Sequence, residues 1–408
     1  MFICCIAPSN LLHAGFDVAG AVRGALVITT MTGIDVAIIG VGLVGSAVIQ
    51  QLTSAASPAS SLHIVSLQNS KKLLIAKPGE KLSLDATGSW RDSLAKSNVA
   101  APNLEQLVKL LEEIRAVNKR HLVVVDNTSD EKVASFYPSF MQAGFSVVTP
   151  NKKAFSGSLD LYSDILHSAI KQRGSDAQPP LVYQESTVGA GLPIISTLDD
   201  LVITGDKIIR IEGVLSGTLS YIFNEFSPPG GSTRKFSEIV NVARDNGYTE
   251  PNPGDDLSGS DVARKLTILS RLIPELSNLL PGGFESLDTQ SLTPAPLANV
   301  TDPEEYVRRL PEFDSEFDAL RAKAQEKNCV LRYVGLIDVE NKQVKAGLLE
   351  YPASHPFATS LGGSDNIISF TTQRYTPRPL LVQGAGAGAD VTAMGVVADL
   401  MRIAARRE

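Results

Sequence analysis

One stretch decides the fold: Val36-Ala37-Ile38-Ile39-Gly40-Val41-Gly42-Leu43-Val44-Gly45. A buried type of strand runs into glycines at the spacing GxGxxG, and a helical stretch, Ser46 to Leu52, follows. The first glycine permits a tight turn, the second lets the backbone approach a pyrophosphate, and the third lets helix and strand pack. The start of the helix then faces the anion. We therefore predict a dinucleotide site at Gly40, Gly42, Leu43, Val44 and Gly45, with a glycine turn used only for packing as the alternative.

Further apolar runs follow at the spacing of βαβ units. Leu62 to Leu67, Leu122 to Val125 and Phe145 to Val148 have the character of strands, and Leu104 to Ile114 has a helical pattern. Strands that alternate with helices are typical of a parallel sheet covered on both faces. We predict an α/β fold with a Rossmann-type doubly wound parallel sheet.

The second half of the chain has a different pattern. Strand character is found in Arg210 to Phe226, Val330 to Asp338, Val344 to Leu349 and Ile367 to Thr372, and Lys265 to Leu272 is helical. This pattern favours an α+β domain. We predict a dinucleotide-binding domain at 34–183 plus 384–408, and a catalytic and dimerisation domain at 184–383.

Composition limits the kind of partner. Lys and Arg total 37 against 44 Asp and Glu, which leaves a net charge of −7 over 408 residues, and no basic stripe marks a nucleic-acid surface. The N-terminal apolar stretch is too interrupted to span a membrane. We therefore expect a small-molecule substrate, with neither nucleic acid nor membrane as partner.

The N-terminus and the cysteines bear on the start and location of the protein. Met31 stands almost directly before the first strand, so we predict that 1–33 is an extension, either disordered or a mis-called start, with the natural start at Met31. Of three cysteines, only Cys329 lies in the body of the chain. Such sparse cysteine use favours a reducing, cytoplasmic location.

The end of the second strand bears on the choice of cofactor. An acidic residue that would bind the ribose 2′-hydroxyl of NAD is missing there, because the strand ends Ser66-Leu67-Gln68-Asn69-Ser70-Lys71-Lys72. A 2′-phosphate would be tolerated at this place. We predict NADP in preference to NAD, with Lys71 or Lys72 as the phosphate partner; two solvated surface lysines are the alternative.

Two charges fall on the apolar side of a predicted helix. A helical wheel places Asp261 and Lys265 within the arc of Val262, Leu269 and other apolar residues, and Arg264, Thr267, Ser270 and Arg271 on the opposite face. A buried lysine needs a partner, and one held beside carboxylates in a cleft is a candidate proton donor. The alternative is an ordinary i,i+4 ion pair.

The chain resembles the homoserine dehydrogenase family, most closely its fungal monofunctional members. The resemblance rests on five segments: Thr149 to Lys153, Glu185 to Pro193, Gly213 to Phe226, Gly247 to Pro251 continuing through Asp261 and Lys265, and Gly384 to Ala389. It implies NAD(P)H-dependent reduction of aspartate 4-semialdehyde to homoserine, on the route to threonine and methionine. It also implies a homodimer joined through the second domain.

The resemblance implies roles for particular residues. Lys265 would donate the proton, and Lys152 would lie between nicotinamide and substrate. Glu250 and Asp261 would hold the ammonium group of the substrate, with support from Asp256.

Cofactor and cation contacts follow from the same resemblance. Thr128, Ser129 and Gly388 would contact the cofactor. Glu185 and the backbone carbonyls of Val188, Ala190 and Leu192 would bind Na⁺, because hard cations prefer oxygen ligands; a glycine-rich helix entry without an ion is the alternative.

Two other functions remain open at this point. One is a dehydrogenase for another amino-acid aldehyde, and the other is a Rossmann nucleotide sensor without catalysis. A sensor has no need of a lysine and an aspartate on the apolar arc of a helix, so Lys265 and Asp261 argue against it.

Overall fold

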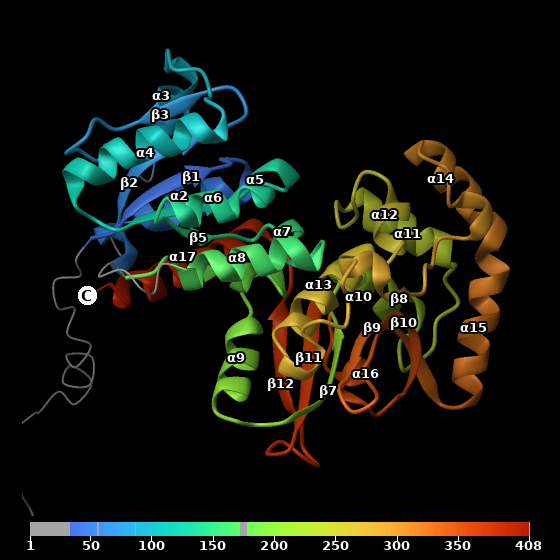
Figure 1. Cartoon of the computed structure of the whole chain (residues 1–408). Helices are drawn as coiled ribbons and strands as arrows, with labels where there is room; N and C mark the ends of the chain where they lie inside the picture. The colour runs from blue at the N-terminus through green and yellow to red at the C-terminus, as the bar shows by residue number, and fades with distance from the viewer. Residues whose placement is uncertain (1–32, 55–56, 86, 172–177, 408) are drawn as a thin grey trace, which may run out of the picture.

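The computed structural model describes residues 33–54, 57–85, 87–171 and 178–407. Two sheets organise this part of the chain, and Figure 1 shows them side by side with helices around each. The proposed start at Met31 lies outside the described residues. No helix of the described ranges combines the length and apolar character that a membrane crossing requires.

The first sheet has the strand order β3-β2-β1-β4-β5-β6. Its strands are β1 (Asp35–Ile39), β2 (His63–Gln68), β3 (Leu73–Ile75), β4 (Leu122–Asp126), β5 (Ser146–Val148) and β6 (Val182–Tyr183). Every neighbouring pair is parallel except β2 with β3. The Rossmann-type fold class is therefore confirmed, and the edge strand β3 was not predicted because three residues carry too little periodicity.

Helices cover both faces of this sheet. They are α2 (Leu43–Thr53), α3 (Trp90–Lys96), α4 (Leu104–Asn118), α5 (Glu131–Ser135), α6 (Tyr137–Gln142), α7 (Lys153–Ser156), α8 (Leu159–Lys171) and the C-terminal α17 (Ala389–Ala405). One hydrophobic cluster joins the sheet to α2 and α17; a second joins its other face to α4, α6 and α8 and continues into the second half of the chain. The red C-terminal helix in Figure 1 lies with the first sheet, so the chain returns to where it began.

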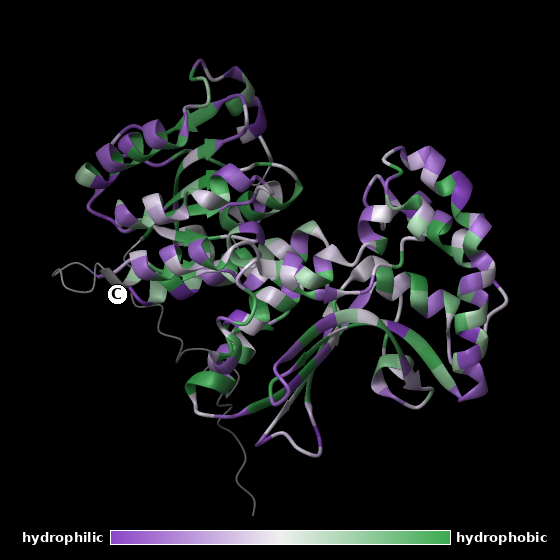
Figure 2. Ribbon diagram, turned by 45° about the vertical axis from the view of Figure 1, so that its right-hand side comes forward, coloured by the Kyte–Doolittle hydropathy of each residue, from purple (hydrophilic) through white to green (hydrophobic). Residues whose placement is uncertain are grey.

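The second sheet is mainly antiparallel, with the order β12-β11-β7-β9-β10-β8. Its strands are β7 (Ile208–Val214), β8 (Asp288–Thr289), β9 (Cys329–Asp338), β10 (Gln343–Pro352), β11 (Asp365–Thr372) and β12 (Leu380–Ala385). Around it lie α9 (Ile195–Ile203), α10 (Gly217–Phe226), α11 (Phe236–Asp245), α12 (Pro253–Leu257), α13 (Ser260–Arg271), α14 (Pro303–Arg309), α15 (Asp314–Glu326) and α16 (Pro356–Thr359). Figure 2 shows the strands of this sheet curving beneath the helices. The domain division stays a prediction, and β12 extends to Ala385, past the predicted boundary at 384.

The strand predicted over Arg210 to Phe226 is only half right. Its first part is β7, but 217–226 form helix α10, whose start is capped by the Ser216 hydroxyl accepting the Leu219 N–H at 3.2 Å. Leu219, Ile222, Phe223 and Phe226 are buried along one side of this helix. Their i, i+3, i+4, i+7 spacing is helical, so periodicity decides over the strand propensity of aromatic and β-branched residues.

Candidate active site

Lys265 lies on α13 with its ammonium group almost fully enclosed. Only 6% of the residue is exposed. Its Nζ donates to Asp261 Oδ2 at 2.7 Å and to the backbone carbonyl of Leu215 at 2.6 Å. An ammonium group has three N–H donors. Two are therefore assigned within the described chain, and one remains for a ligand.

Lys152 reaches the same carboxylate from the other sheet. It follows β5, directly before α7, and its Nζ lies 3.4 Å from Asp261 Oδ1. The Asp261 side chain remains 48% exposed. The structure thus brings together Lys152, Asp261 and Lys265 where the two halves of the chain meet, although 113 residues separate the lysines.

This cluster carries two cations for one anion. Burial raises the pKa of Asp261, but the ammonium groups of Lys265 and Lys152 outweigh it and hold that pKa well below its usual range. Burial lowers the pKa of Lys265; Asp261 opposes the shift and Lys152 adds to it. A lysine with a lowered pKa is a better acid at neutral pH, and the surplus positive charge favours an oxygen that becomes negative.

The polar side of α13 is also buried, which the helical wheel does not indicate. Thr267 and Ser270 are fully buried, and Arg271 is 4% exposed. The Arg271 guanidinium donates to the carbonyls of Phe155 at 2.7 Å and Gly157 at 2.6 Å, at the end of α7. This face is polar because it docks onto the first half of the chain, not because it meets solvent.

Asp256 organises the loop that carries Glu250. Its carboxylate accepts the Glu250 backbone N–H at 2.8 Å and the Thr218 hydroxyl at 2.9 Å. Burial raises the pKa of Asp256 to about 6, against the effect of these two hydrogen bonds. Asp256 therefore positions the backbone of Glu250.

Glu250 itself is set apart from the lysine cluster. Its exposed side chain borders a hollow of about 420 Å³ that Arg244 and Glu304 also line. No hydrogen bond or ion pair within the described residues joins its carboxylate to Asp261, Lys152 or Lys265. The structure thus groups Asp261 with the lysines and places Glu250 on the neighbouring loop.

The glycine loop fits a dinucleotide. Gly40 has φ +86°, and a Cβ there would lie 2.7 Å from the Thr128 methyl group, whereas one at Gly45 would collide with the Gly40 carbonyl. A Cβ at Gly42 would meet nothing within 4 Å, and Leu43 is 85% exposed at the start of α2. Gly42 supplies no side-chain cap to this helix. Tight packing on one side, open space on the other and free amide groups are what a pyrophosphate requires.

Unpartnered polar atoms mark the rest of the nucleotide surface. Both side-chain polar atoms of Asn127 and the Oε1 atom of Gln68 are buried without a hydrogen-bond partner in the described chain. Such groups are costly unless a ligand or water satisfies them. Thr128 and the exposed Ser129 follow directly after Asn127. Asn127 was missed from the sequence, where it reads as one of four polar residues in a turn.

The two lysines proposed for a 2′-phosphate differ in the structure. Lys72 Nζ donates to the Ser97 carbonyl at 2.7 Å, and both backbone N–H groups of Lys71 and Lys72 donate to Asn69 Oδ1 at 2.8 Å. The Lys71 side chain is exposed and has no ion pair within the described ranges. Of the two, Lys71 has its charge available.

Comparison with known proteins identifies the family of this chain. The profile for homoserine dehydrogenase matches residues 193–401, and the profile for the NAD binding domain of homoserine dehydrogenase matches 40–176. Homoserine dehydrogenases of Schizosaccharomyces pombe and Saccharomyces cerevisiae are each 44% identical over 91% of this chain and 96% and 98% of theirs. The chain belongs to the homoserine dehydrogenase family. It is an NAD(P)-dependent oxidoreductase.

Solved structures extend the comparison to the fold. A protein of unknown function from Candida auris superimposes with a TM-score of 0.82 at 43% identity, covering 92% of this chain and 99% of that one. An archaeal homoserine dehydrogenase in complex with NADPH has a TM-score of 0.62 at 19% identity and covers 92% and 98%. The archaeal enzyme shares the fold.

The structure surrounds this homoserine dehydrogenase site with residues the sequence did not single out. Thr218, at the start of α10, has its hydroxyl 2.5 Å from the Tyr248 carbonyl, besides its contact with Asp256. The Tyr248 ring is 45% exposed and meets Tyr221 edge-on at 5.0 Å. Assigning Arg210 to Phe226 to a strand concealed Thr218, because its place at the start of helix α10 is what brings it to Asp256.

Gly388 lies where the chain turns back to the first sheet. It precedes α17 with φ +120°, and it is exposed. The Asp390 carbonyl accepts from Gln51 Nε2 at 2.9 Å, which ties the start of α17 to α2, the helix of the glycine loop.

The predicted cation ligand Glu185 is already occupied. Its carboxylate accepts the backbone N–H of Ile195 at 2.8 Å, that of Ser196 at 3.1 Å and Arg402 Nη1 at 3.0 Å, with 3% of the residue exposed. A carboxylate neutralised by a guanidinium and a helix start does not fit a cation ligand. The Leu192 carbonyl accepts the Ile194 N–H at 2.8 Å, and Ala190 has φ +56°. Sodium stays a prediction that rests on the carbonyls of Val188, Ala190 and Leu192.

Proposed function

We propose that this chain reduces the aldehyde of aspartate 4-semialdehyde to the alcohol of homoserine, with Lys265 as the proton donor. The buried ammonium group of Lys265, held by Asp261 and the Leu215 carbonyl with one donor left over, carries the proposal. NADPH supplies the hydride when it is bound. Lys265 stabilises the aldehyde oxygen as it gains charge and gives it a proton, and Lys152 adds a second positive charge.

Carboxylates hold the other end of the substrate in this proposal. Asp261 remains ionised between the two lysines, and Glu250 offers an exposed carboxylate without an ion pair in the described chain. Glu250 would attract the ammonium group, the exposed edge of Asp261 would accept a hydrogen bond from it, and Asp256 fixes the loop on which Glu250 lies. Placing charged substrate groups at fixed points orients the aldehyde beside Lys265.

The test follows the absorbance of NADPH with aspartate 4-semialdehyde, for wild type and Lys265→Ala, and measures cofactor binding separately by fluorescence. We expect turnover by wild type, and loss of turnover with unchanged cofactor binding in the variant. Equal loss of binding and turnover would reject Lys265 as the proton donor. Tight cofactor binding by an inactive wild type would favour another amino-acid aldehyde or a nucleotide sensor.

We propose NADP as the preferred cofactor. The end of β2 offers the neutral Gln68, whose Oε1 is unpartnered in the described chain, and the free charge of Lys71 three residues later. Lys71→Ala is expected to raise the KM for NADPH about tenfold and leave that for NADH unchanged, since one charge-assisted contact contributes about 1.5 kcal/mol. Equal changes for both cofactors would exclude a 2′-phosphate contact.

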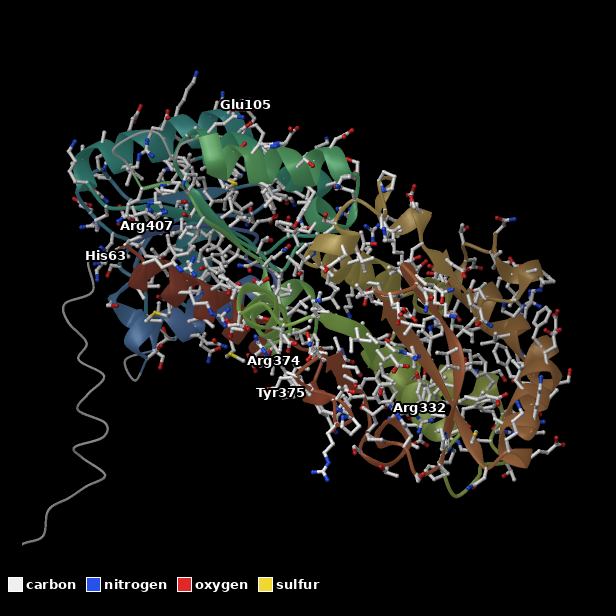
Figure 3. The ribbon with its side chains drawn as sticks, turned by 60° about the horizontal axis from the view of Figure 1, so that its bottom comes forward. His63, Glu105, Arg332, Arg374, Tyr375 and Arg407 are labelled. Atoms are coloured by element: carbon white, nitrogen blue, oxygen red, sulfur yellow. The ribbon has the colours of Figure 1, made fainter. Side chains whose placement is uncertain are left out.

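We propose a homodimer in the cytoplasm, joined through the second sheet. Strand β12 is an edge strand, and apolar side chains are exposed on it and in the turn that precedes it: Leu381 at 41% and Tyr375, labelled in Figure 3, at 40%. Exposed apolar groups beside an unpaired edge favour association. Light scattering should give twice the chain mass, and Leu381→Lys should shift it toward the monomer.

We propose that turnover requires sodium and that the backbone carbonyls of Val188, Ala190 and Leu192 bind it without Glu185. Turnover measured with sodium replaced by a large organic cation at equal ionic strength tests it. Unchanged turnover would leave the 185–195 segment as a helix entry without an ion.

A further inference from the structure

Asp126, the last residue of β4, is a buried carboxylate to which the mechanism above assigns nothing. It is fully buried, and no lysine, arginine or histidine of the described residues forms an ion pair with it. Burial raises its pKa, and the hydrogen bonds it accepts oppose this. A buried carboxylate without an ion pair costs free energy unless hydrogen bonds compensate it, so its surroundings should show what it does.

Donors from three different segments converge on this carboxylate. Oδ1 accepts the backbone N–H of Thr128 at 2.8 Å and the Thr128 hydroxyl at 2.7 Å. Oδ2 accepts the Tyr137 hydroxyl at 2.6 Å and the side-chain amide of Asn151 at 3.0 Å. Thr128 belongs to the nucleotide loop after β4, and Asn151 to the loop after β5. One side chain therefore links the two loops.

Asn151 passes this link on to Lys152. Its Nδ2 also donates to the Asp130 carbonyl at 3.0 Å, and its Oδ1 accepts the Lys153 backbone N–H at 3.1 Å. Its own N–H donates to the Thr149 hydroxyl at 2.8 Å. The backbone on both sides of Lys152 is thus fixed by one asparagine, which is itself oriented by Asp126.

We propose that Asp126 is a positioning residue for the reduction: through Asn151 it aligns the Lys152 ammonium group with Asp261 and Lys265, and through Thr128 it ties that alignment to the nucleotide loop. The inference rests on the proposed function, because Lys152 matters only if Lys265 donates a proton. Misplacement of a catalytic group by about 1 Å can cost about 100-fold in rate.

The amide variant separates positioning from charge. In Asp126→Asn, Oδ1 can still accept both Thr128 donors, but Nδ2 would face the Nδ2 donor of Asn151, and that hydrogen bond is lost. Asn151→Ala breaks the same link from the other end and leaves Asp126 with three donors. Tyr137→Phe is the matched control, because it removes one donor to Asp126 and leaves the hydrogen bonds that Asn151 donates to Asp126 and to the Thr149 hydroxyl in place.

The pH profile supplies a readout that a purely structural role would not move. The charged side chains facing Lys265 are Asp261, from its own helix, and Lys152, from the loop before α7, and Lys152 lowers the Lys265 pKa. If Lys152 moves away, the pKa of Lys265 rises. The alkaline limb of kcat should then shift upward in both link-breaking variants and stay in place in Tyr137→Phe.

We expect Asp126→Asn and Asn151→Ala each to lower kcat at least tenfold at pH 7, with the KM for NADPH within about threefold. The double variant should be no slower than the slower single one, since both changes break one link. Additive losses, or lower kcat with an unmoved alkaline limb, would overturn the proposal. An inactive wild type would instead reject the proposed function, and the melting temperature of each variant identifies misfolding; Asn151→Ala remains available should Asp126→Asn not fold.

Discussion

Two clusters of this chain are each built from carboxylates and basic side chains, and they differ in whether a hydrogen-bond donor remains available. In one, Asp261 is 48% exposed and lies between the ammonium groups of Lys265 and Lys152. In the other, Glu185 is 3% exposed and lies against the Arg402 guanidinium, which also donates to the buried Asp399 at 2.7 Å. Asp399 in turn accepts the Glu185 backbone N–H at 2.9 Å.

The difference shows how a surplus hydrogen-bond donor distinguishes a catalytic cluster from a structural one. The Glu185 cluster balances two carboxylates with one guanidinium and two amides at the start of α9, and it joins α17 to the segment between the sheets. The Asp261 cluster has two cations on one carboxylate and a free donor on Lys265. A further negative oxygen is favoured only at the Asp261 cluster. At the Glu185 cluster, the two carboxylates already have their donors.

Removing the proton donor should have the largest effect. Lys265→Ala is expected to lower kcat about 1,000-fold, within the range of general acid catalysis. The other lysine beside Asp261, Lys152, is more exposed and lies farther from the carboxylate, so it does not replace Lys265. Steady-state kinetics with NADPH and aspartate 4-semialdehyde measure it. The contrast between the clusters would fail if Arg402→Met, which removes a cation from the other cluster, lowered kcat as much.

Removing the second cation should have the next largest effect. Lys152→Ala is expected to lower kcat about 100-fold, because the site loses one positive charge beside the developing negative charge. Since Lys152 also lowers the pKa of Lys265, the alkaline limb of the pH profile should move upward. A lower kcat with an unmoved limb would mean that Lys152 acts on the substrate alone.

Removing the cation of the Glu185 cluster should lower the stability of the fold and leave kcat nearly unchanged. Arg402→Met leaves Glu185 and Asp399 without their cation, but Arg402 is 38% exposed, so solvent screens part of the loss. We expect the free energy of unfolding to fall by about 1–2 kcal/mol, measured by urea denaturation, with kcat changed by less than about threefold. A strong loss of kcat at unchanged stability would make this cluster part of the catalytic machinery.

The sequence predicts the Asp261 cluster better than the Glu185 cluster. Asp261 and Lys265 are visible because i,i+4 charges inside an apolar arc are unusual, and the glycine loop is visible because its spacing has a backbone cause. Arg402 escapes notice because it lies 217 residues after Glu185, and nothing local indicates that they meet. The resemblance to relatives instead suggested a cation beside Glu185, where the structure places a guanidinium.

Other features depend on contacts that the sequence does not display. The burial of Arg271 follows from docking onto the end of α7, and the role of Asp126 follows from three segments that converge on it. The fold class was predictable because strand and helix periods are local. Helix α10 was predicted as a strand because its aromatic and β-branched residues favour strands. Only its Ser216 cap and the spacing of its apolar residues indicate a helix.

The smallest effect expected concerns Asp256, which lies outside both clusters and whose pKa burial raises to about 6. Its ionised form is the better acceptor for the Glu250 N–H, so kcat/KM should rise as the pH increases through about 6. Because its folded pKa is raised, the folded state keeps a proton that the unfolded state releases, and this contribution to stability is lost between about pH 4 and 6. Asp256→Asn should remove the acid limb while lowering kcat/KM only a few-fold, and its melting temperature relative to wild type should increase from pH 5 to 7. An acid limb that persists in the variant would assign it to another group, such as Asp399, whose pKa burial also raises to about 6.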